Sequence, residues 1–254
     1  MLLAAKRRGA ETVIADLRQQ GSLKALFPRV RGDALQAVFL NTAGGLTGGD
    51  AMRIDVTAGQ GAHVVLSSQA AERAYRAQPG QTARMEVTLD VGPGGRIDWL
   101  PQETILFDAA ALNRKLTVHL AADATALLVE PVIFGRTAMG EVVHDLHFTD
   151  QWRVSRDGAL VFADAVRMTG DADALLARKA IADGAGAMAT LLLASPKAAA
   201  FADLDLPENC GASLIADDLL LVRLLAADGF ALRRALVPLV EVLSAAPIPR
   251  VWRL

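Results

Sequence analysis

The stretch Arg84-Met-Glu-Val-Thr-Leu-Asp-Val91, followed directly by Gly92-Pro-Gly-Gly95, decides the fold class. Its polar and apolar side chains alternate, and a period of two is typical of a β-strand with one buried face. The same alternation occurs in Met52-Arg-Ile-Asp-Val-Thr-Ala58 and in Arg114-Lys-Leu-Thr-Val-His-Leu120. Each of these segments therefore predicts a strand.

Turn signals separate these and other short segments over the first two thirds of the chain. Examples are Gly59-Gln-Gly61 and Asp157-Gly158, and more continuously apolar runs occur at Ala126-Leu-Leu-Val129 and Leu160-Val-Phe-Ala163. Short strands at regular spacing, bounded by glycine-rich turns, indicate an all-β sandwich, barrel or solenoid. The sequence therefore predicts a mainly β protein.

Helical periodicity appears mainly near the C-terminal end. Asp228 is placed to cap a helix there, and Pro238 inside the pattern predicts a kink or a break. Weaker helical patterns cover residues 173–183 and 196–204. The apolar side chains at the spacing of one helix face are Leu232, Leu236, Leu239 and Leu243.

Composition excludes several classes of protein. The 254 residues include 26 Lys and Arg against 28 Asp and Glu, a net charge of −2, so no large basic field for nucleic acid is expected. One cysteine, Cys210, excludes an internal disulfide framework and indicates a reducing compartment. The apolar run 185–194 is far shorter than the roughly 20 residues that cross a bilayer. We expect a soluble cytoplasmic protein with no membrane partner.

No linker, low-complexity run or internal repeat divides the sequence, so residues 1–254 are predicted to form a single domain. Hydrophobic residues make up 52% of the chain, and the mean hydropathy is +0.31. These values fit either a rich core or an exposed apolar surface for docking.

The segment Asn41-Thr-Ala-Gly-Gly-Leu-Thr-Gly-Gly-Asp50 is dense in glycine. A Walker A loop needs Lys and then Ser or Thr after its last glycine. Asp50 stands there instead, and its carboxylate would repel phosphate, so a nucleotide loop is excluded. Two interpretations stay open: a glycine turn between strands, or a loop that presents Asp50 to a cation or a partner.

Four further carboxylates, Glu72, Glu103, Glu130 and Glu141, lie next to glycines or apolar runs. Isolated charges are costly to bury, so each is expected to be paired, hydrated or part of a docking surface. They form no spaced motif of acid–base catalysis, and the sequence contains no Gly-x-Ser-x-Gly elbow. The alternative is a carbohydrate-active enzyme on a β-helix scaffold, with a carboxylate pair in an open cleft.

Six segments, in order, resemble the urease accessory protein family UreD, called UreH in some bacteria. The similarity extends from about Gly21 to Leu254. Departures from the family pattern are small: Ser68, Arg73 and Ala109 stand where the family often has Thr, Lys and Gly. The segments are residues 41–50, 68–76, 99–107, 135–141, 150–164 and 249–252.

The resemblance implies a non-enzymatic scaffold for nickel insertion into apo-urease. Members of the family bind the urease subunits and the accessory protein UreF, which recruits the GTPase UreG, so a hetero-oligomer is expected. The resemblance also implies a β-helix-like or β-solenoid-like fold with a few helices, chiefly near the C-terminus, and a water-filled tunnel for nickel. No tightly bound cofactor is expected, and nickel would bind only transiently.

A nickel route must hold the ion weakly. Carboxylates and water bind Ni²⁺ less tightly than nitrogen and sulfur donors do. Each glycine-flanked acid could instead be the ion-pair partner of an arginine. The hypothesis is that the route is lined by residues among Asp50, Glu72, Glu103, Glu130 and Glu141.

Partner binding is assigned to cationic and aromatic side chains of the segments that carry the resemblance. UreF contacts are expected near the C-terminal helix and the Pro249-Arg-Val-Trp252 end. The residues assigned to partner binding are Arg73, Tyr75, Arg76, Arg136, Arg250 and Trp252.

Overall fold

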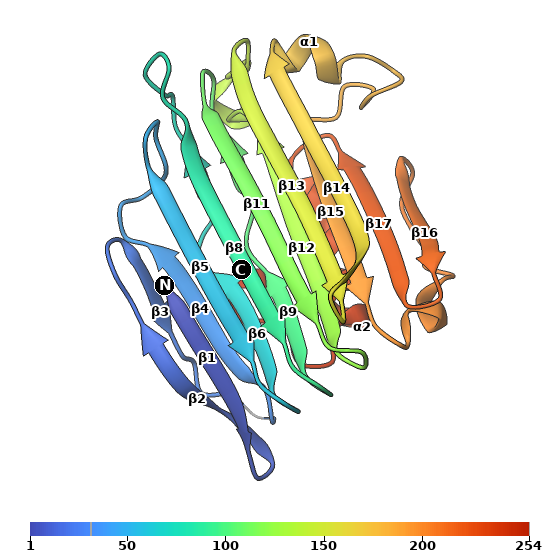
Figure 1. Cartoon of the computed structure of the whole chain (residues 1–254). Coiled ribbons are helices and arrows are strands. Elements are labelled where there is room, and N and C mark those ends of the chain that lie inside the picture. Colours follow the sequence, from blue (N-terminus) through green and yellow to red (C-terminus); the bar gives the residue numbers. More distant parts are fainter. Residues whose placement is uncertain (31, 254) are drawn as a thin grey trace.

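A computed structural model describes residues 1–30 and 32–253 and arranges them as two stacked β-sheets (Figure 1). The alternating segments are strands: β5 (Ala51–Ala58), β8 (Ala83–Val91) and β11 (Ala111–Leu120). Apart from the first residues of β5 and β11, their apolar side chains are buried, and most of the intervening polar ones are exposed or half-buried. The prediction of a mainly β fold is confirmed.

Sheet A carries the strand order β14-β13-β11-β8-β5-β1-β2, and sheet B the order β16-β17-β15-β12-β9-β6-β4-β3. Two short strands, β7 and β10, extend sheet B beside β12. The remaining strands of sheet A are β1 (Leu2–Arg8), β2 (Glu11–Arg18), β13 (Leu146–Arg156) and β14 (Ala159–Gly170). Those of sheet B are β3 (Leu23–Leu26), β4 (Leu35–Asn41), β6 (His63–Ser68), β7 (Glu72–Ala74), β9 (Arg96–Leu100), β10 (Thr104–Leu106), β12 (Thr125–Phe134), β15 (Ala187–Ala194), β16 (Cys210–Ala216) and β17 (Leu219–Ala226).

The chain winds between the two sheets as a solenoid. From β4 to β13 the long strands fall alternately in sheet B and sheet A, and neighbours within each sheet run parallel. Each pair of consecutive strands therefore forms one coil that stacks on the next. This arrangement confirms the expected β-solenoid-like architecture.

Antiparallel strands close the solenoid at both ends. β2 and β3 fold back on β1 and β4 at the N-terminal end, while β14 pairs with β13 and β15, β17 and β16 follow β12 at the other end. Three of these outer pairs contain a shift in register, at Ala4/Ala5, at Val154/Ser155 and at Leu214/Ala216. Such bulges increase the local twist of an edge.

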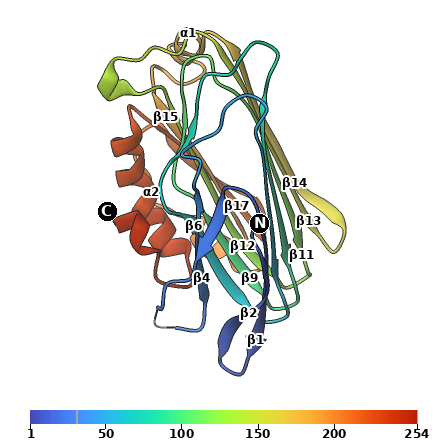
Figure 2. The same ribbon diagram turned by 90° about the vertical axis from the view of Figure 1, so that its left-hand side faces the viewer.

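Hydrophobic side chains gather in two layers. One cluster fills the space between the sheets and includes Trp99, Phe148 and Trp152. The other lies between sheet B and helix α2 (Gly229–Leu243), which covers the face of sheet B that points away from sheet A (Figure 2). Sheet B is thus buried on both faces, whereas the outer face of sheet A is open.

Helix α2 begins after Asp228, whose carboxylate accepts a hydrogen bond from the Ala231 backbone N–H, as the sequence predicted. The helix continues through Pro238 to Leu243. No helix in the described part of the chain has the length and apolar composition needed to cross a bilayer.

The two weaker helical predictions hold only in part. Of residues 173–183, only the first turns are helical, because α1 spans Ala172–Leu176 and the Arg178 carbonyl then accepts the N–H groups of a tight turn. Of residues 196–204, four form the 3₁₀-helix η2 (Ala198–Phe201). The other short 3₁₀-helices are η1 (Thr137–Met139) and η3 (Arg250–Arg253).

Buried and exposed positions alternate along β8, so substitutions at the two kinds of position should differ sharply in their effect on the free energy of unfolding. We expect Leu89→Ala to lower the free energy of unfolding by about 2–5 kcal/mol, since Leu89 is fully buried between the sheets. Glu86→Ala on the same strand, at an exposed position, should change it by less than about 0.5 kcal/mol. Urea unfolding measures both, and equal effects would contradict the burial pattern.

Candidate functional site

The glycine-dense segment 41–50 is the turn that joins β4 to β5. Gly45 lets it lie against β7, because a Cβ there would be 2.3 Å from the Tyr75 ring and 2.7 Å from the Arg73 carbonyl oxygen. The Asn41 side-chain amide donates to the Gly45 carbonyl at 2.9 Å. Asp50 is exposed, and its carboxylate accepts the Thr47 N–H at 2.8 Å.

A cavity of about 210 Å³ opens beside this turn. Phe39, Asn41, Ser68 and Glu72 are among its lining residues. Glu72 is half-buried and accepts a hydrogen bond from the Asn41 amide at 3.2 Å. Burial raises the pKa of the Glu72 carboxyl above its ordinary value, although the Asn41 bond favours the charged form.

A buried group of charges lies deeper, between the two sheets. Arg114 of β11, Glu130 of β12 and Asp150 of β13 are only 3%, 4% and 5% exposed. The Arg114 guanidinium donates to Glu130 at 2.5 Å and to Asp150 at 2.6 and 3.1 Å. The Trp99 indole N–H donates to the other Glu130 oxygen at 2.7 Å. One guanidinium therefore joins a carboxylate of its own sheet to one of the opposite sheet.

This group holds two carboxylates against one cation, so it would carry a net negative charge if both were ionised. Burial raises the pKa of Glu130 to about 7, with the Asp150 charge adding to the effect and Arg114 opposing it. Burial disfavours the charged form of the Arg114 guanidinium and tends to lower its pKa. Asp150 and Glu130 outweigh this effect and together raise the pKa of Arg114 above its ordinary value. A carboxyl group with the pKa of Glu130 exchanges a proton near neutral pH.

Thr104 connects the cavity to the buried charges. It stands in register with Glu72 on the neighbouring strand, and residues paired in this way have side chains on the same face. The Arg114 guanidinium donates to the Thr104 hydroxyl at 3.1 Å. Polar groups thus follow one another from Asn41 and Glu72 at the cavity through Thr104 to Arg114 and Glu130. We call this series the polar line.

Of the five acids in the nickel-route hypothesis, Glu72 and Glu130 lie on the polar line. Glu103 lies on the helix side of sheet B, where the Arg233 guanidinium of α2 donates to its two oxygens at 3.0 and 3.1 Å. Glu141 accepts two hydrogen bonds from the Arg136 guanidinium, at 2.8 and 2.9 Å, which lowers the pKa of its carboxyl. Glu103 and Glu141 are therefore ion-pair partners, and Asp50 stays at the surface.

Three of the residues assigned to partner binding gather at one surface. Tyr75 packs edge-on against the Phe107 ring with centroids 5.0 Å apart, and the Arg136 guanidinium lies 4.3 Å from the same ring. Arg76 forms an ion pair with Asp108 at 2.9 Å. The three side chains are exposed, so this surface is open to a partner.

The other three assigned residues lie elsewhere or are buried. Arg73 is exposed on β7, and Arg250 is exposed at the start of η3. Trp252 is only 2% exposed, its indole N–H donates to the Leu100 carbonyl at 3.0 Å, and its ring lies 5.1 Å from the Arg233 guanidinium. The indole of Trp252 therefore packs in this chain's own core, between sheet B and α2.

Sequence reasoning missed Arg114 and Asp150, although a signal was present. In β11, Arg114 falls in the same phase as the buried Leu116 and Val118. In β13, Asp150 falls in the phase of Trp152. A charged residue at an apolar position of an alternating strand predicts a buried, paired charge.

Within residues 1–30 and 32–253, no group of three or more His, Cys, Asp or Glu side chains is placed to hold a metal ion. His144 and His147 face separate aspartates, Asp171 at 3.3 Å and Asp145 at 3.6 Å. These two histidines, three residues apart in sequence, therefore form no shared site.

The fold and the polar line define a two-sheet β-solenoid with charged groups inside its core. The family model described as UreD urease accessory protein matches residues 1–253, and this chain belongs to that family. The urease accessory protein UreD of Roseobacter denitrificans is 47% identical over 99% of this chain and 93% of its own length. That of Ruegeria pomeroyi is 46% identical over 99% of both chains, and that of Rhizobium leguminosarum bv. viciae 45% identical over 99% of this chain and 93% of its own.

The raised pKa of Glu130 predicts a pH-dependent stability. Because its folded-state pKa of about 7 lies above the ordinary 4.5, the contribution of Glu130 is fully present below pH 4.5 and is lost as the pH rises through 7. We expect the free energy of unfolding of the wild type to fall over this interval relative to that of Glu130→Gln. Urea unfolding at several pH values measures the difference, and a constant difference would contradict the assignment.

Removing the Arg114 cation alone should lower the free energy of unfolding more than removing Arg114, Glu130 and Asp150 together. Arg114→Met leaves Glu130 and Asp150 buried together without a partner, and we expect it to lower the free energy of unfolding by about 3–5 kcal/mol. The triple variant Arg114→Met, Glu130→Leu, Asp150→Leu buries no charge and should recover most of that loss. Thermal or urea unfolding compares the two. If the triple variant is as unstable as Arg114→Met, the loss in the free energy of unfolding comes from altered packing and not from unpaired buried charge.

Proposed function

We propose that this chain is a non-catalytic scaffold for urease maturation. It acts in the cytoplasm within a complex with UreF, UreG and the apo-urease subunits, and nickel is the cargo that the complex delivers. The observation that carries this proposal is the match to the urease accessory family over residues 1–253.

The polar line supports a role in nickel transit. Glu72 stands at the cavity with a raised pKa, and Glu130 has a pKa of about 7 inside the core. A carboxyl group that exchanges a proton near neutral pH can take up a cation in place of that proton. Oxygen ligands hold Ni²⁺ less tightly than nitrogen or sulfur, so the ion moves on.

Two surfaces suit the protein partners. The exposed Tyr75, Arg76 and Arg136 form one, which adjoins the cavity turn because the Tyr75 hydroxyl donates to the Gly44 carbonyl at 3.2 Å. The other is the outer face of α2, where Phe230 is 73% exposed. We assign this outer face of α2 to UreF.

The sugar-active alternative is less well supported. The carboxylates that share one guanidinium, Glu130 and Asp150, are both buried. A glycosidase needs its carboxylate pair on either side of a sugar in an accessible cleft. Their burial between the sheets leaves no room for a polysaccharide.

Glu72→Gln tests the transit role because it removes the charge at the cavity but keeps the shape and the contact with Asn41. We expect urease matured in its presence to contain less nickel and to show proportionally lower activity, while the accessory complex still assembles. The matched control is Glu11→Gln, an exposed position on β2 that should give normal nickel content. Metal analysis of purified urease and size-exclusion chromatography of the complex are the measurements.

Normal nickel content with Glu72→Gln would remove the polar line from the proposal but leave the scaffold role. Normal urease maturation in cells that lack this chain altogether would contradict the scaffold role itself.

A further inference from the structure

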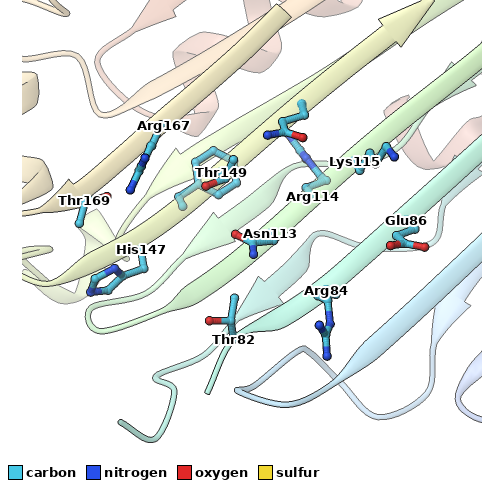
Figure 3. A pocket seen from close by; sticks show the side chains of 12 residues that line it. Thr82, Arg84, Glu86, Asn113, Arg114, Lys115, His147, Thr149, Arg167 and Thr169 are labelled. Carbon is cyan, nitrogen blue, oxygen red and sulfur yellow. The ribbon is translucent and has the colours of Figure 1, made fainter. Parts of the chain in front are cut away.

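The outer face of sheet A carries an open groove with a volume of about 560 Å³. It crosses strands β8, β11, β13 and β14, and none of the residues of the polar line except Arg114 borders it. Three exposed cations, Arg84, Lys115 and Arg167, lie along it, as Figure 3 shows. Glu86 is the one acid among its lining residues.

Strand register sets the positions of these groups. Arg84 stands opposite Asn113, Asn113 opposite Thr149, and Thr149 opposite Arg167, so the four form a row across the sheet. Three interstrand spacings of about 4.8 Å place Arg84 and Arg167 about 14 Å apart at the backbone. Lys115 lies two residues along from Asn113, on the same face. The row presents cations at its ends and hydrogen-bonding side chains between them.

These cations have no ion-pair partner among residues 1–30 and 32–253. Arg53, on the same face of the sheet but outside the groove, is instead paired with Asp55 at 2.9 Å. The whole chain carries a net charge of −2, whereas this groove holds three exposed cations against one acid, Glu86, which stands in register opposite Lys115. Such a surface attracts negatively charged partners and sets their orientation.

The chemistry of the groove favours carboxylates over nucleic acid. The imidazole of His147 is the one exposed ring among its lining residues, since Phe148 is only 1% exposed, so the groove offers no series of rings for successive bases to stack on. Its floor consists of strands whose backbone N–H groups are engaged in the ladder, so it offers no glycine-rich loop or helix N-terminus for a phosphate. Separate cations on a flat floor suit separate carboxylates.

We propose that this groove binds an acidic, extended segment of a partner protein. In an extended segment, side chains two residues apart lie on one face about 7 Å from each other. Acidic residues at positions i and i+4 therefore match Arg84 and Arg167, and one at i+2 falls between Asn113 and Thr149, on the side of the row where Lys115 lies. The proposal is independent of the nickel route, because it uses the opposite face of sheet A.

The test measures binding of a fluorescein-labelled peptide in which Glu and Ser alternate over nine residues, by fluorescence anisotropy with the full chain at low salt. We expect saturable binding that weakens as NaCl is added. Arg84→Glu combined with Arg167→Glu should weaken binding at least about tenfold, since each contributes a charge contact. The double variant Arg84→Gln with Arg167→Gln removes the two charges without reversing them and should weaken binding less. It replaces the charge-reversal variant in the test if that variant does not fold.

The matched control is Lys6→Glu combined with Arg18→Glu, which changes the charge equally on β1 and β2 of the same sheet. We expect this control to bind the peptide nearly as the wild type does. The proposal is overturned if the wild type shows no saturable binding, or if the control loses as much affinity as the groove variant. It is also overturned if tripolyphosphate or a single-stranded oligonucleotide binds the groove more tightly than the peptide does.

Discussion

The guanidinium of Arg114 links the two sheets through charge deep inside their common core. It reaches Asp150 on the next strand of its own sheet and Glu130 on the facing sheet. A buried charge separated from its partners is strongly destabilising, so any arrangement that slides one sheet past the other is penalised. Hydrophobic packing alone tolerates such shifts far better. Thr104 is held in the same arrangement, because the Arg114 guanidinium donates to its hydroxyl, and Glu72 stands beside Thr104 in the strand register.

Adjacent acidic and polar residues of sheet B lie on opposite faces of the sheet and bind different partners. Glu103 and Thr104 are neighbours in sequence, yet one binds Arg233 of α2 and the other Arg114 inside the solenoid. Successive side chains of an extended segment point to opposite faces, so adjacent residues serve different environments. The acids of this chain therefore cannot be assigned to one site by their proximity in sequence.

Local patterns in the sequence predicted most of the fold. Alternation located the segments that form β5, β8 and β11, and a capping aspartate with a leucine stripe located α2. Pairing across long stretches could not be predicted, because Glu103 and its partner Arg233 are 130 residues apart and no local spacing relates them. The helical pattern of residues 173–183 located α1 but overestimated its length, because the helix ends at Leu176 and a turn at Arg178 follows. For the site, the sequence indicated which acids stand out but not which arginines neutralise them.

The antiparallel pairs at both ends of the solenoid decide how copies of the chain can meet. A parallel stack with bare ends could accept a coil from another molecule and grow into a fibre. Here β2, β3, β14 and β16 occupy those ends, and bulges in three of the four outer pairs twist the edges away from a flat template. A protein so rich in apolar strands thus resists end-to-end polymerisation by its topology, and its length is set at the number of coils that it encodes.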